Sequence, residues 1–472
     1  MEVSLTHWKA RLAALGVPVY QGIPLLLRED LRSGRLSAGD RLPALRALAS
    51  QLDLDYTTVA RAYGEARRLG LVDSAPGRGT VVRAPVPRRS VRPVSPLEMT
   101  MNMPPESRDP EILSRLQSGL DFIGHLADPH ALLRYQEFGG TLEDREAAAA
   151  WLQAVLPGVD AARVLVTPGI QGALASVMGL LAAAGEVILA EPVTYPGVKA
   201  MAAQLGVRVA ALACDADGVL PAAFEHACRE LKPRLLYLNP TLSNPTCQTV
   251  PLARREALAD IALRHSVPIV EDDAYGMLLD DPLPAFAQLA PEQVWYLTGL
   301  AKCLGAGLRI GFLVPPDAAR RRLAASALRT TTIMASPVTM ALATHWLRDG
   351  TADLMLAAVR QESRARQKLV REVLADLQVQ TQPEAFHCWL HLPDTVHRLP
   401  LAASLRQHGM AAVASDTFTM EGTPPNAIRL CLGGELARGD CRQALLRVRE
   451  HIDLAGAAPD AAGLVTEASR SS

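Results

Sequence analysis

Three short amphipathic patterns follow one another near the start of the chain. The first runs from Tyr20 to Ser33 and stops before Gly34, with apolar residues three or four positions apart. The second follows Pro43, which we place at the first position of a helix. The third begins at Asp55 as its N-cap and ends at Gly70. The spacing therefore predicts three consecutive helices.

A β-hairpin is predicted after the third helix. Leu71-Val72 and Thr80–Val82 flank a turn at Pro76–Gly79, which is rich in turn-forming residues. Three helices followed by such a hairpin predict a winged helix over residues 1–83.

Part of the third predicted helix is not needed for a core. Thr57, Thr58 and Arg61 lie on its other face. Hydroxyl donors near a helix N-terminus suit phosphate contacts, and Arg61 one turn later could reach a base edge. The alternative is a solvated helix face.

Prolines dominate residues 84–110, where seven of them occur without any apolar period. Fixed φ angles and missing N–H donors predict an extended spacer over this range. At the other end of the chain, we expect residues 457–472 to be a disordered tail.

Short apolar runs alternate with helical patterns between Arg163 and Val314. Most of the runs are separated by segments long enough for a helix, which predicts an α/β fold. We expect a seven-stranded, mainly parallel sheet with helices on both faces, forming a large domain over residues 111–320. The runs are 164–167, 187–190, 207–212, 235–238, 268–271, 294–298 and 309–314.

Polar residues follow the ends of these predicted strands. In such sheets, ligands bind beyond the carboxyl ends of the strands. Each residue alone has an ordinary explanation as a turn former or a solvated side chain, but their convergence on one edge predicts a binding site. They are Gly169, Ile170, Gln171, Tyr195, Asn244, Asp272, Tyr275, Lys302 and Arg309.

From residue 321 to 456 the pattern changes to longer helices with a few strands, which predicts a smaller α+β domain. One of these strands contains His387 and His391 on the same face. With no third ligand near them in the sequence, we expect no metal site there.

Composition narrows the class of protein. No apolar run approaches the roughly 20 residues of a membrane helix, and we expect neither a signal peptide nor contact with a membrane. The seven cysteines are scattered and never form a C-x-x-C motif, which favours a reducing, cytoplasmic location.

Charge is unevenly distributed along the chain. Residues 1–92 contain fifteen Lys and Arg against eight Asp and Glu, a balance of +7, so the remainder carries −8 of the total of −1. A basic head on an acidic body is typical of a nucleic-acid-binding module joined to an enzyme-like domain.

The segments 35–46 and 57–63 resemble the winged helix-turn-helix of the GntR family, over residues 19–83 as a whole. The resemblance implies binding to double-stranded operator DNA. Tyr56 stands where some relatives have a basic residue, which affects base preference more than binding itself. The residues that would approach DNA are Arg46, Thr57, Thr58 and Gly79.

Residues 99–452 resemble the fold-type I enzymes that depend on pyridoxal 5'-phosphate (PLP), the aspartate aminotransferase superfamily. Three motifs carry the resemblance: Asn244-Pro245-Thr246, Asp272-x-Ala274-Tyr275, and Lys302 followed seven residues later by Arg309. The resemblance implies that Lys302 forms a Schiff base with PLP and that Asp272 pairs with its pyridinium nitrogen.

The same resemblance implies the remaining cofactor contacts. Asn244 and Tyr275 would hydrogen-bond the phenolic oxygen, and Tyr195 would stack on the ring. Arg309 and the turn at residues 169–171 would hold the phosphate.

Two further residues extend the resemblance, and two depart from it. Tyr135 matches a tyrosine that reaches the phosphate of the neighbouring subunit, which implies a homodimer. Arg429 matches the residue that binds a substrate carboxylate through a bidentate fork. Gly299 stands where many relatives have Ser or Thr, and Cys247 where they have glycine.

A GntR-type head joined to an aminotransferase-like body resembles the MocR subfamily of bacterial regulators. The resemblance implies a transcription regulator that senses PLP or a small amine or amino-acid effector, through transaldimination at Lys302. The alternative is a PLP-dependent aminotransferase with an accessory DNA-binding head, since Lys302, Asp272 and Arg429 are all present. A body that only dimerises is disfavoured by the intact Lys302.

Overall fold

The structure is a computed structural model, which describes residues 5–68, 70–75, 79–83, 99–126 and 128–457. The chain forms two compact units, Met1–Val94 and Ser95–Ser472. The predicted tail at 458–472 and the first part of the predicted spacer, 84–98, lie outside the described residues.

The first unit is a small helical domain with a three-stranded antiparallel sheet in the order β1-β3-β2. Its apolar core includes Trp8, Leu27, Leu48 and Val59. In chain order its elements are α1 (Trp8–Ala14), α2 (Val19–Arg32), β1 (Arg41–Leu42), α3 (Leu45–Leu52), α4 (Tyr56–Arg68), β2 (Val72–Ala75) and β3 (Gly79–Val82).

The predicted three helices and the hairpin are confirmed, with two additions and one correction. The additions are α1 and the two-residue strand β1, which pairs with β3. Pro43 is not at the first position of α3, because Ala44 is the N-cap and the helix begins at Leu45.

A buried carboxylate holds the start of this unit together. Asp30 on α2 is fully buried and accepts hydrogen bonds from Trp8 Nε1 (2.6 Å), Arg11 Nη1 (2.6 Å) and Arg35 Nε (2.8 Å). His7 Nε2 lies 2.9 Å from the same carboxylate. These donors outweigh the cost of burial, and the pKa of Asp30 lies well below its usual value.

The second unit contains the predicted seven-stranded sheet, in the order β4-β12-β11-β10-β9-β5-β6. β12 runs antiparallel to both of its neighbours, and the other pairs are parallel, so the mainly parallel sheet is confirmed. The strands are β4 (Leu165–Thr167), β5 (Val187–Ala190), β6 (Arg208–Ala211), β9 (Leu236–Leu238), β10 (Ile269–Asp272), β11 (Val294–Gly299) and β12 (Gly311–Val314).

Alternate residues of these strands pack on opposite faces of the sheet. Leu236 and Leu238 belong to one apolar core, and Tyr237 between them belongs to the other. In β10, Ile269 and Val270 divide in the same way. The sheet is therefore covered on both faces, as expected for parallel strands.

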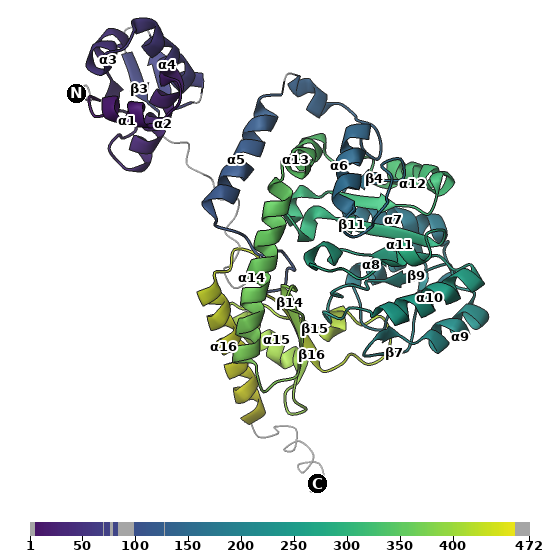
Figure 1. Cartoon of the computed structure of the whole chain (residues 1–472). Helices are drawn as coiled ribbons and strands as arrows, with labels where there is room; N and C mark the ends of the chain where they lie inside the picture. Colours follow the sequence, from purple (N-terminus) through teal and green to yellow (C-terminus); the bar gives the residue numbers. More distant parts are fainter. Residues whose placement is uncertain (1–4, 69, 76–78, 84–98, 127, 458–472) are drawn as a thin grey trace, which may run out of the picture. The chain divides into compact units, whose positions relative to one another are not determined.

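Helices surround this sheet, and Figure 1 shows their arrangement. α7 follows β4 and packs against α12, while α9 and α10 pack against each other. The helices are α5 (Pro110–Gly124), α6 (Leu142–Leu152), α7 (Ile170–Leu181), α8 (Pro196–Leu205), α9 (Pro221–Leu231), α10 (Leu252–His265), α11 (Phe286–Leu289), α12 (Ala318–Thr331), α13 (Pro337–Arg348) and α14 (Thr351–Val373). Five short 3₁₀ turns are described: η1 (Pro129–Leu133), η2 (Gly276–Leu278), η3 (Leu300–Lys302), η4 (Ala306–Leu308) and η5 (Ser415–Thr417). A separate hairpin pairs β7 (Cys214–Asp215) with β8 (Gly218–Val219).

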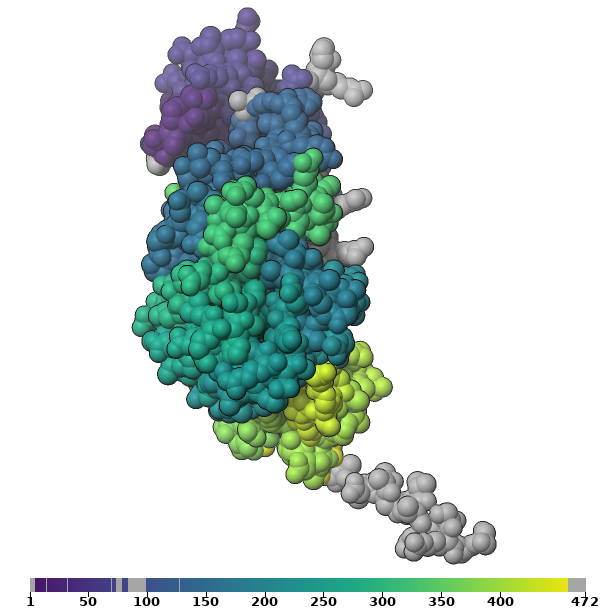
Figure 2. Space-filling model, turned by 90° about the vertical axis from the view of Figure 1, so that its right-hand side faces the viewer, coloured from purple at the N-terminus to yellow at the C-terminus, as the bar shows by residue number. Residues whose placement is uncertain are grey.

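A four-stranded sheet in the order β13-β14-β16-β15 has an apolar core of its own. α14 reaches from α5 and α13 to α16, as Figure 1 shows. On the face shown in Figure 2, α13 lies beside the α5–α6 region, and these helices are in contact. The added elements are β13 (Val379–Gln380), β14 (His387–His391), α15 (Arg398–Gln407), β15 (Val413–Ala414), β16 (Ala427–Cys431) and α16 (Arg438–Ala457).

Residues 99–109, which we expected to belong to the spacer, instead form part of the second unit. Met99 is buried in the core of the four-stranded sheet, and its carbonyl oxygen accepts from the Cys431 N–H at 3.0 Å. Pro104 O accepts from the Gly434 N–H at 3.1 Å, and Pro105 forms a parallel bridge with Gly434. Prolines lack donors but keep their carbonyl acceptors, so a proline-rich segment can still pair with a strand edge.

Within the described residues, the structure has no helix that is both long enough and apolar enough to cross a membrane.

The cluster around Asp30 predicts a stability effect. Asp30→Asn should lower the free energy of unfolding of the first unit by about 3 kcal/mol. The substitution removes the buried negative charge that accepts from the two arginines and the indole N–H. Thermal unfolding of the full chain, monitored by hydrogen exchange in peptides of the first unit, would measure this loss of stability. Asp53→Asn is the control, because the Asp53 side chain is 84% exposed and pairs with Lys9 at the surface. Equal stability of the two variants would contradict this prediction.

Candidate functional site

The predicted polar residues meet where the parallel strands end, and Asp272 is the most deeply held of them. It is the last residue of β10, and its Oδ2 accepts from Tyr237 Oη at 2.7 Å. Asn239 Nδ2 donates to its backbone carbonyl at 2.6 Å. Asp272 Oδ1 is buried and has no hydrogen-bond partner among the described residues. Burial raises the pKa of Asp272 to about 6, although the Tyr237 hydrogen bond opposes this.

Lys302 lies at the end of the 3₁₀ turn that follows β11. Its Nζ donates to the backbone carbonyl of Asn102 and lies 5.9 Å from the centre of the Tyr275 ring. Burial lowers the pKa of Lys302 to about 8. The charges of Arg429, Asp272 and Arg309 also act on this amine, so the predicted residues share one electrostatic environment.

The glycine turn after β4 and Arg309 form the outer end of the site. Gly169 has a φ of 80° and is the N-cap of α7, without a side-chain cap. A Cβ on Gly169 would lie 3.2 Å from Arg309 Nη2, so the guanidinium stands directly over the turn. The first N–H groups of a helix have no intrahelical partner, and with the arginine they suit a phosphate.

Gln171 links this turn to Tyr195. Gln171 Oε1 accepts from Arg309 Nη2 at 3.3 Å, and Gln171 Nε2 donates to Tyr195 Oη at 2.7 Å. The structure therefore brings the predicted turn at residues 169–171 together with the side chains of Arg309 and Tyr195.

Arg429 lies in the middle of β16 and is buried. Its Nη1 donates to Asn244 Oδ1 at 2.7 Å, and its Nη2 donates to the carbonyl oxygen of Thr100. Arg429 Nε is buried without a partner in the described part of the chain. Asn244 in turn is held through its backbone N–H by Asn239 Oδ1 at 2.7 Å.

Tyr275 is joined to Asn102, which the sequence pattern did not indicate, and through Asn102 to His387. Its hydroxyl accepts from Asn102 Nδ2 at 2.8 Å, and the same amide nitrogen lies 3.4 Å from His387 Nδ1. His387 Nε2 lies 3.1 Å from the Ser243 carbonyl, so Nε2 carries the hydrogen and Nδ1 accepts. Burial lowers the pKa of His387 to about 3, so the ring is neutral at physiological pH. Asn102 has no signal in the sequence, because its segment has the composition of a spacer.

The two departures from the family pattern have physical explanations. A Cβ on Gly299 would lie 2.8 Å from the Ile310 carbonyl oxygen, which leaves no room for Ser or Thr. Cys247 stands at the usual glycine position with a φ of 60°, so the left-handed backbone is kept without glycine. Its thiol contacts the His387 carbonyl at 3.2 Å and is buried.

Tyr135 is the predicted residue that the single chain does not bring to this site. Its side chain is 77% exposed, in the loop after η1.

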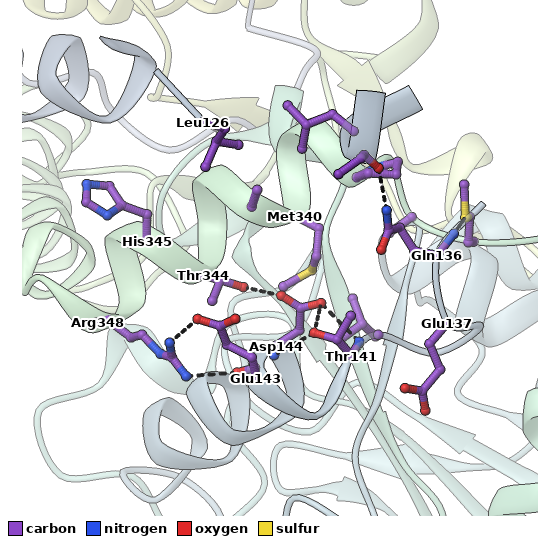
Figure 3. A pocket seen from close by; sticks show the side chains of 18 of the residues that line it. Leu126, Gln136, Glu137, Thr141, Glu143, Asp144, Met340, Thr344, His345 and Arg348 are labelled. Atoms are coloured by element: carbon purple, nitrogen blue, oxygen red, sulfur yellow. Dashed lines mark hydrogen bonds and ion pairs between the residues drawn. The ribbon is translucent and has the colours of Figure 1, made fainter. Parts of the chain in front are cut away.

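A cavity of about 460 Å³ lies on the α5, η1, α6 and α13 side of this unit. Figure 3 shows Thr344 and Thr141 hydrogen-bonded to Asp144, and Glu143 paired with Arg348. None of the cofactor residues predicted from the sequence is among the residues that line it.

In the first unit, the predicted DNA-contacting residues lie on α3, α4 and the hairpin. Arg46 and Thr57 are exposed, and Thr58 is half-buried. The Arg61 guanidinium stacks on the Tyr20 ring at 3.8 Å, an intramolecular contact that competes with the base contact we expected. Gly79 begins β3, and Arg41 stands over it, with Nε 3.2 Å from where a Cβ would be. Arg41 has no signal in the sequence, because β1 is only two residues long and shows no pattern.

Comparison with protein families gives two matches on this chain. Residues 98–448 match the family described as aminotransferase class I and II. Residues 19–82 match the bacterial regulatory proteins of the gntR family.

Similar proteins share both parts. The uncharacterized HTH-type transcriptional regulator YdeF of Bacillus subtilis is 26% identical over 452 residues, covering 94% of this chain and 97% of YdeF. The vitamin B6 salvage pathway transcriptional repressor PtsJ of Salmonella typhimurium is 27% identical over 414 residues, covering 86% of this chain and 92% of PtsJ.

Among solved structures, the second unit is similar to LysN, an α-aminoadipate aminotransferase from Thermus thermophilus complexed with N-(5'-phosphopyridoxyl)-L-leucine. The TM-score is 0.68 at 24% identity, covering 76% of this chain and 92% of LysN. This likeness shows the fold.

Proposed function

Because this chain belongs to the aminotransferase class I and II family and carries a GntR-family domain ahead of it, the MocR architecture, we propose that it is a PLP-dependent, DNA-binding transcription regulator. The proposed signal is PLP, alone or with a small amine or amino-acid effector. As a regulator bound to DNA, it would act in the bacterial cytoplasm. YdeF and PtsJ, which match both parts of the chain, are described as transcriptional regulators.

One observation carries the cofactor assignment: Asp272 Oδ1 is a buried acceptor without a donor among the described residues. An unsatisfied buried acceptor costs about 1–3 kcal/mol, and a protonated ring nitrogen is the donor that would satisfy it. The residues present therefore fit PLP. When bound, PLP supplies an aldehyde that exchanges one amine for another and a ring that withdraws electrons.

Different residues of the chain would hold different parts of PLP. Lys302 supplies the amine, and its lowered pKa leaves about a tenth of it neutral at pH 7, far more than for a solvated lysine. Asp272 would hold the ring nitrogen, Asn244 and Tyr275 would hydrogen-bond the phenolic oxygen, and Tyr195 would stack on the ring. Arg309 and the turn at 169–171 would bind the phosphate.

Arg429 is the proposed contact for an effector carboxylate. Its buried Nε and the adjacent Nη2 form an edge that matches the two oxygens of a carboxylate. Such an effector changes DNA binding only as far as it binds two states of the protein with different affinity.

We also propose a homodimer in which Tyr135 reaches the partner's phosphate site. Large apolar side chains are exposed on α5, η1 and α6, in the same stretch of chain as Tyr135: Leu133 is 78% exposed, Leu142 56% and Leu120 55%. Exposed apolar side chains of this size are typical of an interface.

The alternative function is a PLP-dependent aminotransferase with an accessory head. The complete set of Lys302, Asp272 and Arg429 favours it. Steady turnover of an amino acid with a 2-oxo acid, without DNA binding, would establish the alternative in place of the regulator.

Attachment of PLP is testable through Lys302. Lys302→Ala should lack the visible absorbance of covalently attached cofactor, whereas Lys199→Ala, which removes an exposed lysine on α8, should keep it. With cofactor-free wild-type protein, the rate at which the band appears should rise with pH up to about 8 and then level off, because only the neutral amine reacts. A rate that keeps rising to about pH 10 would contradict the buried, depressed amine.

DNA binding is testable with a duplex selected by the wild-type protein from a random-sequence library. Arg46→Ala should weaken binding about fivefold and reduce the slope of log affinity against log salt by about one, because it removes a phosphate contact. Lys9→Ala removes the same charge from α1, which carries none of the predicted DNA-contacting residues, and should leave the slope unchanged. If both variants bind like the wild type, the proposed DNA-binding face is wrong.

The dimer is testable by the mass of the protein in solution, measured by light scattering. Leu133→Asp should shift the mass from dimer towards monomer, because it places a charge in an apolar interface. Leu231→Asp, at the end of α9, makes the same chemical change on a 44% exposed side chain and should not. A monomeric wild-type protein would rule out the shared site.

A further inference from the structure

Residues 99–106, which we name the strap, cross the site that holds the two cationic residues. The Thr100 carbonyl accepts from Arg429 Nη2, and the Asn102 carbonyl accepts from Lys302 Nζ. In the proposed function, Arg429 binds an effector's carboxylate, and Lys302 is the amine that the effector's own amine would replace on PLP. The Thr100 carbonyl of the strap therefore occupies a guanidinium donor that the carboxylate of an amino acid would need.

Both ends of the strap are attached to β16 and the residues after it. Met99 O accepts from the Cys431 N–H at 3.0 Å, Pro104 O accepts from the Gly434 N–H at 3.1 Å, and the Glu106 N–H donates to Gly434 O at 3.2 Å. A Cβ on Gly433 would overlap the Met103 carbonyl oxygen, so the strap lies in direct contact with this backbone. β16 carries Arg429, so the strap runs beside the strand whose side chain it contacts.

The middle of the strap is fixed by its own side chain. Asn102 is 8% exposed, and its amide donates to Tyr275 Oη and approaches His387 Nδ1. His387 is neutral at physiological pH, so this attachment does not titrate there. The Asn102 attachment is therefore independent of Arg429, whereas the Thr100 attachment depends on it.

We propose that the strap competes with an effector's carboxylate for Arg429 and is released at its Thr100 end when that carboxylate binds. This inference rests on the proposed function. A carboxylate pairs with a guanidinium through charge-assisted, bidentate hydrogen bonds, which are roughly twice as strong as those of a neutral carbonyl. Every pair of adjacent Arg429 nitrogens includes one that already donates to Asn244 or Thr100. The Nε–Nη2 edge is the one whose Nε is unpartnered among the described residues, and Thr100 is its competitor.

Effector binding would have the opposite effect on the contact between Lys302 and the Asn102 carbonyl. The unattached side chain donates to the Asn102 carbonyl, whereas attachment to the cofactor would leave its nitrogen at most one N–H. An effector that displaces it from the cofactor returns that amine, so the Asn102 contact is available again as the Thr100 contact is lost. The release is therefore directed to the N-terminal end of the strap, which continues through residues 84–98 to the DNA-binding unit.

The effect of the carboxylate can be measured with two ligands that differ only in that group. The probes are N-(5'-phosphopyridoxyl)-L-leucine and the corresponding adduct of 3-methylbutylamine, which differs only in lacking the carboxylate. Both leave Lys302 as a free amine, and binding of each to the full-length protein is measured by calorimetry. Hydrogen–deuterium exchange then follows the Cys431 and Gly434 amides, which donate to the two ends of the strap.

With the leucine adduct, the Cys431 amide should exchange at least about threefold faster than with the amine adduct, while the Gly434 amide should change less. If both adducts bind and the Cys431 amide exchanges equally fast in both complexes, the strap proposal is wrong and the proposed function stands. If neither adduct binds, the cofactor site itself is wrong, and the strap proposal falls with it.

Gly433→Ala provides a second measurement. Its Cβ would displace the Met103 carbonyl, so exchange at Cys431 and Gly434 should be fast without ligand and no longer depend on the carboxylate. Gly439→Ala, on α16 with open space around its Cβ position, is the control and should behave like the wild type. Slow exchange in a folded Gly433→Ala protein would overturn the proposal.

Discussion

The site in the second unit depends on one buried oxygen atom that has no donor among the described residues. β10 carries Asp272 into a position where its carboxylate is excluded from water. Tyr237 holds the carboxylate through Oδ2, and Asn239 holds the backbone carbonyl of the same residue. Folding thus leaves an acceptor that the described chain does not satisfy. Native structures rarely keep such a group without a use, because its desolvation is not compensated. A ligand with a proton on a ring nitrogen removes this cost, and the surrounding residues are placed with respect to that atom.

Two basic side chains, Lys302 and Arg429, lie near this carboxylate and are largely shielded from water, and their surroundings affect them differently. Burial moves the pKa of Lys302 towards physiological pH, which makes its amine available as a nucleophile. The Arg429 guanidinium is held by the Asn244 amide oxygen and a backbone carbonyl. Neutral acceptors satisfy these cations without neutralising them. An anionic ligand can therefore still gain by replacing one of the neutral partners, which is the physical basis of a responsive site.

The first unit relies on the opposite arrangement. Asp30 is buried as well, but it is surrounded by donors, and its pKa is lowered instead of raised. The hydrogen-bonding capacity of the Asp30 carboxylate is used within the unit. It therefore stabilises the fold and has no acceptor position for a ligand. The same residue type thus has two roles, and the number of donors within reach decides between them.

The sequence by itself determined the elements and their order. Seven apolar runs predicted the seven strands, because buried parallel strands must be apolar, and the polar residues after those runs identified one edge of the sheet. Asp272 and Lys302 could be found in this way because they stand at or just after the carboxyl ends of strands that local pattern reveals, and Arg309 because it lies seven residues after Lys302. Tertiary structure alone decided what those residues touch. The segment 99–109 was interpreted as a spacer, since prolines interrupt every period, yet its carbonyl oxygens accept from Lys302 and Arg429, which lie 200 and 329 residues away along the chain. Backbone acceptors are common to all residue types, so the sequence carries no mark of which ones are used. The stacking of Arg61 on Tyr20 escaped the same analysis for a related reason: periodicity assigns a side chain to a face, and only packing between helices determines its partner.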